Sequence, residues 1–590
     1  MKNFFKYTLA TILGGIITFF LAFLILAAII GGIVAASGDD SSVTIKENSI
    51  LKVKFDQRII DREPLDPMAD FKFASDGDTK IKGLNVILRS IDAASNDSKI
   101  KGIYLDANSF AGGGLATLES LRNALLDFKT SGKFIYSYAE AYSQKAYYIA
   151  SVSDSIFVNP AGAVELKGIG AQLMFFKNAL DKYGVDMQII RGPNNKFKSA
   201  VEPFMYDKMS PANREQMNVF LGSIWDNMAN QMAISRNIPI KDFNIIADSL
   251  WSDDPQRALS LNLIDGIKYI DEVSAILANK VGVDEEDLEM VSLSDYSTTV
   301  SKKNVLTKEK IAVIYAVGEI KSGEGNDEII GSERIAKAVR KARKDTTIKA
   351  IVLRVNSPGG SALASEIMWR ELVLAKETKP LVVSMGDLAA SGGYYISCMA
   401  DKIIAQPNTL TGSIGVFGMI PNFEKLLNEK IGITTDEVST NANSVLGVFT
   451  PLTPFQLKSI QQSVVRIYGT FIGHVAEGRG MTIEQVDAIG QGRVWSGTNA
   501  LEIGLVDELG NLDRAIEVAA EMAKIEKFKI KEMPKRKNPL EEMMKQFGSN
   551  VKMSIVKSEL GENVKYYNYL QTLKEMDGVQ ARIPYFIELN

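Results

Sequence analysis

Continuous apolar runs alternate with amphipathic stretches along most of the chain. Runs of five to ten apolar residues bounded by polar ones are typical of strands that are buried on both faces of a sheet. In the C-terminal half such strands are predicted at 311–320, 348–357, 381–386 and 403–407. Residues 332–345 between the first two have apolar side chains at helical spacing, and Ser332 is expected to cap that helix. The alternation predicts an α/β fold with a largely parallel sheet.

The same pattern occurs twice. Three segments of the N-terminal half match segments of the C-terminal half in the same order and at nearly constant spacing. The matching pairs are 100–109 with 348–357, 146–160 with 393–407, and 250–252 with 494–496. Chance matches would not keep their order, so the sequence indicates a tandem duplication.

The N-terminus differs from both repeats, because residues 7–38 are uncharged and mostly apolar. About 20 such residues can cross a bilayer as a helix. Lys2 and Lys6 precede the run, whereas Asp39 and Asp40 follow it, so the positive-inside rule leaves the start of the chain in the cytoplasm and the rest outside. The alternative is a cleaved signal peptide, whose apolar core is usually shorter, about 7 to 15 residues.

These patterns divide the chain into four parts. We expect a membrane anchor at 1–40, a first α/β repeat at 41–305, a second α/β repeat at 306–530 and a C-terminal extension at 531–590. The extension is expected to contain a helix and a final strand at 582–589.

The amino-acid composition limits the kinds of active site that the chain can contain. The 590 residues are 46% hydrophobic and 23% charged, which is an ordinary globular balance, and a net charge of −4 gives no basic field for nucleic acid. There is one Cys, Cys398, and one His, His474. An internal disulfide is therefore impossible, and a zinc site built on His and Cys is excluded. A serine hydrolase would have to use His474 as its base or use a different residue type.

Two segments of the second repeat have unusual backbone composition. Residues 357–361, Ser-Pro-Gly-Gly-Ser, follow a predicted strand, and glycines there let backbone N–H groups face a ligand. Residues 385–395 place Ser391 among small residues after the next strand. By itself, the first segment is more typical of a simple turn, and the alternative for the second is a close helix crossing.

The two repeats differ at these segments in a complementary way. The position of Ser391 is occupied by Gln144 in the first repeat, which therefore lacks the candidate nucleophile. The first repeat has lysines in 191–204, whereas the matching stretch 438–449 has none. If each repeat once carried both residue types, one composite site that needs both repeats remains.

Four motifs in order give the chain a family resemblance: FKSAVEPF, RVNSPGGS, MGDLAASGGYYIS and TLTGSIGVFG. The chain resembles the long, duplicated form of signal peptide peptidase A, also called protease IV. The resemblance implies tandem domains of the Clp protease and crotonase fold, serine peptidase activity on hydrophobic peptides such as cleaved signal peptides, no cofactor or metal, and a homotetramer. It also implies a single-pass protein of the cytoplasmic membrane, with its catalytic body on the extracytoplasmic or periplasmic side.

The resemblance also assigns roles to residues. It implies Ser391 as nucleophile, Lys198 as base, Ser413 as the hydroxyl that orients the lysine, and the N–H groups of Gly392 and of Gly359 or Gly360 as oxyanion donors. A lysine acts as a base only when it is neutral, so Lys198 is expected to be buried among apolar side chains. His474 is expected to be structural, and Cys398 to be a small buried hydrophobe.

Two other functions remain open from the sequence. A crotonase-like acyl-CoA enzyme would use the same glycines but would not need Ser391. A catalytically silent scaffold of the cell envelope would need neither Ser391 nor Lys198.

Overall fold

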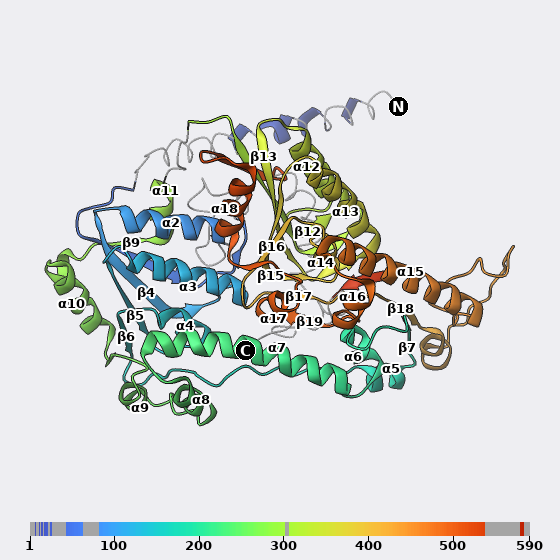
Figure 1. Cartoon of the computed structure of the whole chain (residues 1–590), viewed down its shortest axis with the longest axis horizontal. Helices are drawn as coiled ribbons and strands as arrows, with labels where there is room; N and C mark the ends of the chain where they lie inside the picture. Colours follow the sequence, from blue (N-terminus) through green and yellow to red (C-terminus); the bar gives the residue numbers. More distant parts are fainter. Residues whose placement is uncertain are drawn as a thin grey trace.

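Two α/β units lie side by side in the computed structural model of the chain (Figure 1). The structure describes residues 43–62, 82–300, 306–536 and 579–582, together with scattered positions between Lys6 and Ile25. The first unit is coloured blue to green in Figure 1, and the second is coloured yellow to red.

The central sheets of the two units share one strand order. In the first unit the order is β8-β6-β5-β4-β1-β9, with all neighbours parallel. Its strands are β1 (Ser49–Phe55), β4 (Ile100–Phe110), β5 (Phe134–Ala139), β6 (Ser155–Val158), β8 (Gly266–Ile267) and β9 (Met290–Ser292).

The path β20-β16-β15-β13-β10-β21 repeats this order in the second unit, again with parallel neighbours. Its strands are β10 (Lys310–Val317), β13 (Ile348–Ser357), β15 (Leu381–Ala390), β16 (Lys402–Ala405), β20 (Glu508–Leu509) and β21 (Lys529–Met533). The predicted duplication and the predicted α/β class with parallel sheets are therefore confirmed.

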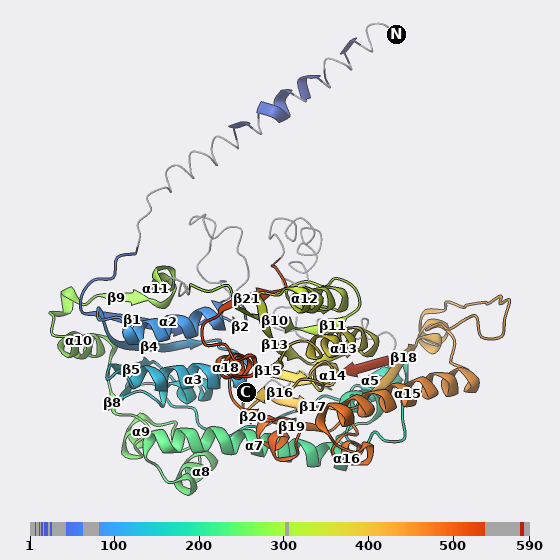
Figure 2. The same cartoon turned by 45° about the horizontal axis from the view of Figure 1, so that its top comes forward.

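Helices cover the sheets and bury the apolar strand faces (Figure 2). They include α2 (Leu84–Asn96), α3 (Leu115–Lys129) and α10 (Ile270–Val281) in the first unit, and α12 (Ser332–Lys344), α13 (Ala362–Lys376) and α18 (Leu512–Ala523) in the second. The long helix α7 (Pro211–Arg236) belongs to the first unit by sequence, but it also contacts β19 (Val494–Ser496) of the second. The two units thus share packing surfaces.

Two local predictions differ from the structure. The run 311–320 is broken at Gly318, whose φ of 99° ends β10 before a separate strand β11 (Glu319–Lys321) begins. The prediction that Ser332 caps the next helix is also wrong. Gly331 is the N-cap, with extended backbone angles, and Ser332 is already the first, buried residue of α12.

A third sheet joins the two units at one side. Its order is β12-β11-β14-β22-β18-β7. Besides β11, its strands are β7 (Asp186–Arg191) from the first unit and β12 (Ile329–Gly331), β14 (Gly359–Ser361), β18 (Phe417–Asn422) and β22 (Val579–Arg582) from the rest of the chain. The glycine-rich segment 357–361 contains β14 of this sheet, and α14 (Gly392–Tyr395), which follows Ser391, contacts β14.

The two ends of the chain lie largely outside the described residues. The described positions between Lys6 and Ile25 are helical. In the part of the chain that the structure describes, no helix is both long and apolar enough to cross a bilayer. Most of the predicted anchor, and all of the predicted final strand except Arg582, falls outside the described residues.

Candidate active site

Ser391 occupies a sharp turn between β15 and the short helix α14 (Gly392–Tyr395). Its φ of 57° and ψ of −114° are unusual for a residue with a side chain, and such strain persists only where neighbours hold it. The Ser391 N–H donates to the Gly412 carbonyl at 2.8 Å, which fixes the turn. The side chain is fully buried.

Lys198 belongs to the first repeat and lies next to Ser391. It lies between β7 and the 3₁₀ turn at Ser199–Val201, and it is fully buried. Its Nζ lies 2.9 Å from Ser391 Oγ, 2.9 Å from Ser413 Oγ and 3.1 Å from the Ser413 carbonyl oxygen. Two residues that are 193 positions apart are therefore in hydrogen-bond contact.

Burial strongly perturbs the pKa of Lys198. Desolvation lowers the pKa of Lys198 well below its ordinary value of 10.5. Apolar side chains close to Lys198 in the sequence are buried as well, namely Phe197, Ala200, Val201 and Phe204. Three of these form one cluster with Phe417 and Met419 of β18. A neutral amine is favoured in such a site.

Ser413, a residue of the second repeat, lies beside the Lys198 amine. It follows β17 (Leu410–Gly412), has a φ of 49°, and donates its N–H to the Arg493 carbonyl at 2.6 Å. Two residues further along, the Gly415 carbonyl lies 3.4 Å from Ser391 Oγ and accepts its hydroxyl proton in one orientation. The Ser391 hydroxyl thus has both an amine and a carbonyl within reach.

The three glycines expected to bind an oxyanion border Ser391. Gly392 follows it as the first residue of α14, and β14, which contains Gly359 and Gly360, contacts that helix. The Gly359 N–H donates to Ser357 Oγ at 3.2 Å. Gly360 has a φ of 152°, and a Cβ there would lie 2.1 Å from the Ile320 carbonyl oxygen, so only glycine fits.

Gly492 and Gln216 also position the lysine, and sequence reasoning missed both. A Cβ on Gly492 would lie 2.4 Å from Lys198 Cβ, and the φ of Gly492 is 83°. Gln216 of α7 donates to the Phe197 carbonyl at 3.0 Å and to Ser199 Oγ at 2.8 Å, on either side of Lys198. Both contacts cross between distant segments, and no local pattern signals them.

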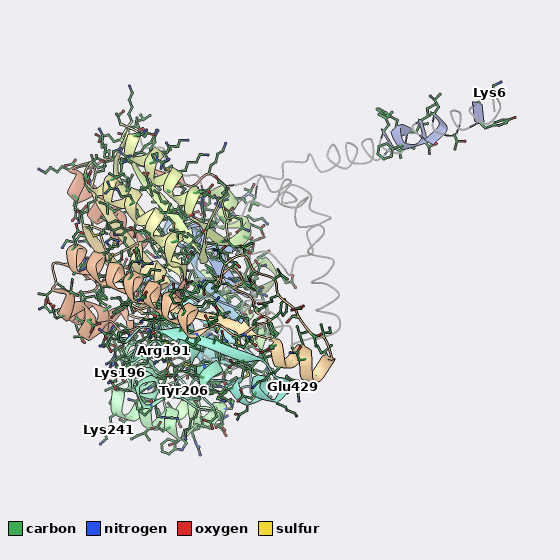
Figure 3. All side chains as sticks on the ribbon, turned by 90° about the vertical axis from the view of Figure 1, so that its right-hand side faces the viewer. Lys6, Arg191, Lys196, Tyr206, Lys241 and Glu429 are labelled. Atoms are coloured by element: carbon green, nitrogen blue, oxygen red, sulfur yellow. The ribbon has the colours of Figure 1, made fainter. Side chains whose placement is uncertain are left out.

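A second lysine of the stretch 191–204 has a different environment. Lys196 is exposed, and its Nζ lies 4.8 Å from the centre of the Phe197 ring (Figure 3). Only one of the two lysines therefore reaches Ser391.

In the first repeat, the position that corresponds to Ser391 is occupied by Gln144, whose side-chain amide is hydrogen-bonded. Gln144 Nε2 donates to the Gly168 carbonyl at 3.0 Å, and Gln144 Oε1 accepts from the N–H groups of Lys167 and Gly168. Gln144 is buried, so its amide fills the space that the counterpart of Ser391 would occupy. The first repeat contributes a lysine to the second repeat's site and has no nucleophile of its own there.

The single histidine and the single cysteine have other surroundings. His474 stacks on Trp369 at 3.5 Å, and its Nε2 lies 3.0 Å from Glu366 Oε2, both on α13. Its ring also packs edge-on against Tyr395 of α14, at 5.4 Å between the ring centres, and makes no hydrogen bond with Ser391 in the described structure. Burial raises the pKa of the Cys398 thiol to about 12. Both residues are structural, as expected.

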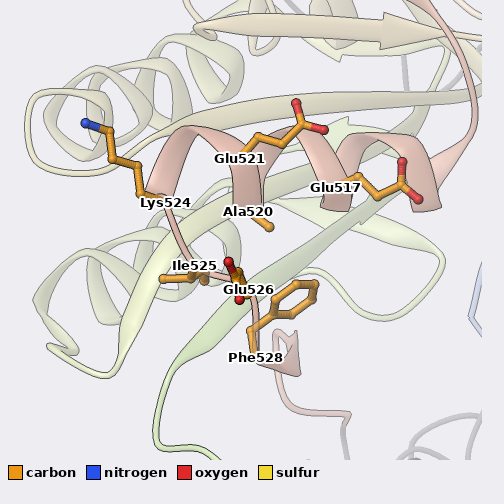
Figure 4. A pocket seen from close by; sticks show the side chains of 7 residues that line it. All are labelled: Glu517, Ala520, Glu521, Lys524, Ile525, Glu526 and Phe528. Atoms are coloured by element: carbon orange, nitrogen blue, oxygen red, sulfur yellow. The ribbon is translucent and has the colours of Figure 1, made fainter.

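An open hollow in the surface lies elsewhere, beside α18 (Figure 4). Acidic and apolar side chains line it, among them Glu517, Glu521 and Phe528. None of the residues expected at the active site lies in this lining.

A profile of peptidase family S49 matches residues 127–284 and 374–526, one segment in each repeat. The chain is 40% identical to Protease 4 of Salmonella typhi over 75% of its own length and 72% of that protein. The chain belongs to peptidase family S49. As a member of this family, it is a serine protease similar to protease IV, and neither an acyl-CoA enzyme nor a silent scaffold fits that assignment.

The chain is also similar to a plant protease and to a solved bacterial structure. The chloroplastic serine protease SPPA of Arabidopsis thaliana is 33% identical over 83% of this chain and 72% of the plant protein. Among solved structures, ClpP1 from Listeria monocytogenes aligns with 34% of this chain and 91% of its own, at 17% identity and a TM-score of 0.23.

Proposed function

We propose that this S49 peptidase is a membrane-anchored endopeptidase with a Ser/Lys dyad, in which Ser391 is the nucleophile and Lys198 is the general base. The observation that carries the proposal is the 2.9 Å contact between the Lys198 amine and the Ser391 hydroxyl, both fully buried. A serine hydroxyl needs an adjacent base, and a desolvated lysine can serve at neutral pH.

Hydrogen-bond counting supports these roles. A neutral amine has two N–H donors and one lone pair. The Ser413 hydroxyl and carbonyl oxygens, at 2.9 and 3.1 Å, can accept the two N–H groups. The lone pair then remains for the Ser391 proton, so Ser413 orients the base.

The reaction would follow from this arrangement. Ser391 Oγ attacks the scissile carbonyl carbon while Lys198 takes the hydroxyl proton. The N–H groups of Gly392 and of Gly359 or Gly360 would stabilise the oxyanion. Lys198 then gives the proton to the leaving amine, and water hydrolyses the acyl-enzyme.

The proposed substrates are hydrophobic peptides, including cleaved signal peptides, met at the extracytoplasmic face of the cytoplasmic membrane. The uncharged run at 7–38 supports an N-terminal anchor. Several apolar side chains described in this run, from Leu13 to Ile25, are more than half exposed, as expected of residues that pack against lipid. A homotetramer is proposed from the resemblance.

Labelling with a fluorophosphonate probe tests the dyad directly. We expect the purified protein to be labelled and to cleave hydrophobic peptides, and the Ser391→Ala variant to do neither. Ser397→Ala is the matched control, because Ser397 is also a buried serine near the turn but donates only to the Gly393 carbonyl. Labelling that persists in Ser391→Ala would show that another residue is the nucleophile.

A further inference from the structure

A bulge interrupts β15 just before the strand reaches Ser391. Three of its residues, 386–388, lie opposite the single residue Asn356 of β13. The Leu388 N–H donates to Asn356 Oδ1 at 3.1 Å, so a side chain holds the bulged segment where regular strand pairing is lost. Bulges re-aim side chains and are frequent beside active sites. This bulge contains Asp387, which precedes Ser391 by one turn of chain.

The Asp387 carboxylate binds the start of a helix in the first repeat. Its Oδ1 accepts the Thr117 N–H at 2.8 Å, and its Oδ2 accepts the Thr117 hydroxyl at 2.7 Å. Thr117 is the third residue of α3, whose N-cap, Gly114, has no side chain to accept the free N–H groups of the first turn. Acidic side chains are favoured at this end of a helix. Asp387 of the second repeat therefore caps a helix of the first.

Position 114 leaves room for this carboxylate because it is a glycine. A Cβ on Gly114 would lie 2.3 Å from Asp387 Cγ and 2.5 Å from its Oδ1. The φ of Gly114 is −70°, which any residue can adopt, so only contact with the carboxylate excludes a side chain here. In the first repeat, the position that matches Asp387 is occupied by Glu140, which is exposed. The carboxylate contact thus belongs to the repeat that carries Ser391.

A second carboxylate connects the same bulge to the first repeat. Asp61 is buried, and it accepts from Asn356 Nδ2 at 2.6 Å and from Arg354 Nε at 2.7 Å. Arg354 also donates to the Met385 carbonyl at 2.8 Å, directly before the bulge. The end of β15 that leads to Ser391 is therefore held to the first repeat at two points.

We propose that Asp387 is a positioning residue of the active site: through its contact with α3 it sets the distance between Ser391 and Lys198. The proposal rests on the proposed function in taking these two residues as the dyad. They belong to different repeats, so their separation depends on how β15 is placed against the first repeat. Beyond the bulge, only the residues 388–390, which pair with β17, separate Asp387 from Ser391. A displacement of about 1 Å at a catalytic group can cost about 100-fold in rate.

Substitutions of Asp387 test this in a peptidase assay with a soluble fluorogenic peptide. We expect Asp387→Ala to lower kcat at least about tenfold and to leave KM within about twofold, because the dyad is displaced while the peptide contacts remain. Asp387→Asn should restore most of kcat, because its amide oxygen can still accept the Thr117 N–H. An unchanged kcat in Asp387→Ala, or an Asn variant as impaired as the Ala variant, would overturn the proposal.

Asp254→Ala is the matched control for loss of a helix cap. Asp254 also caps a helix, α9 (Pro255–Ser260), by accepting two N–H groups of its first turn, and α9 packs on β8 of the first repeat. This variant should keep the kcat of the native protein. A loss equal to that of Asp387→Ala would overturn the proposal, because removal of any cap in the first repeat would then explain both results.

Gly114→Ala disturbs the same contact from the opposite side and guards against misfolding of the Asp387 variant. Its Cβ would occupy the space of the carboxylate, so kcat should fall in the same way. The double variant with Asp387→Ala should be no worse than either single variant, because both remove one contact. Gly170→Ala is the control, since a Cβ there would meet no atom within 4 Å. A native kcat in Gly114→Ala, or losses that multiply in the double variant, would overturn the proposal.

A crystal structure of Asp387→Ala separates this proposal from the proposed function. The distance from Lys198 Nζ to Ser391 Oγ, which is 2.9 Å here, should exceed the hydrogen-bond limit of about 3.5 Å. An unchanged distance would overturn the positioning role. A longer distance in a protein whose Ser391→Ala variant still cleaves peptides would uphold the positioning role and overturn the proposed function.

Discussion

Gly492 lies so close to Lys198 that a Cβ at position 492 would be 2.4 Å from the Cβ of the lysine and 2.7 Å from its Cδ. This contact holds the aliphatic stem of Lys198 from the side of the second repeat. The Gly492 N–H also donates to the Ile414 carbonyl at 2.7 Å, which ties the same glycine to the segment that carries Ser413. The position of the amine therefore depends on a residue with no functional group.

Gly492→Ala should lower kcat/KM about 100-fold, because a displacement of about 1 Å at a catalytic group costs a factor of that size. Gly480→Ala is the matched control. Gly480 also has a left-handed φ, 65°, but a Cβ there would meet no atom within 4 Å. Gly480→Ala therefore introduces the same kind of backbone strain without a steric contact with Lys198, so this variant should retain activity. Equal losses in both variants would mean that strain, and not displacement of Lys198, is responsible.

Ser391→Ala and Lys198→Met should each lower kcat/KM at least about 1,000-fold. The double variant should be no worse than either, since the two residues of the proposed dyad would act as one unit. Lys196→Met is the control for the second substitution, because Lys196 is exposed. Steady-state peptidase assays on these variants and the native protein check this. Losses that multiply in the double variant would argue against a shared unit.

Activity should rise with pH, because Lys198, as the proposed base, would act only when it is deprotonated. Since burial lowers its pKa, the rising limb of kcat/KM should have an apparent pKa well below 10.5. A pH–rate profile of His474→Gln should show the same limb, since the His474 ring contacts Glu366 and Trp369. If the limb disappears in that variant, His474 is the base instead.

The buried lysine also predicts a pH dependence of stability. Its pKa is lower in the folded chain than in the unfolded chain, so between the two values the unfolded chain binds more protons at this residue. The free energy of unfolding of the native protein, measured against that of Lys198→Met, should therefore increase from pH 7 toward pH 10, by at most about 1.4 kcal/mol per pH unit. Denaturant titrations at several pH values measure it, and a difference that stays constant would contradict a depressed pKa.

A form that begins at Ser41 should cleave a soluble peptide ester as fast as the full chain, because no proposed catalytic residue precedes that position. On a peptide embedded in lipid vesicles it should be slower, because the proposed anchor would concentrate the enzyme at the membrane. Equal rates on the embedded peptide would remove that role for residues 1–40. An inactive short form on the ester would show that those residues are needed for folding or assembly.

The amino-acid sequence alone determined the repeated α/β units, because buried strands and amphipathic helices leave a local pattern of apolar residues. It also singled out Ser391, through its missing counterpart in the first repeat, and family motifs pointed to Lys198. Local patterns were less informative at element ends, where Gly331 rather than Ser332 caps α12.

The family motifs implied that Lys198 and Ser391 belong to one site, but only the tertiary structure showed how distant segments meet. The contact of Lys198 with Ser391 across 193 positions, the packing of Gly492 on the lysine and the insertion of β22 between β14 and β18 all join segments far apart in the chain. Such contacts leave no periodicity, because they arise when the two units bury their surfaces together. The same burial removes water from Lys198 and lowers its pKa, so the chemistry of this residue depends on the folded chain rather than on its neighbours in sequence.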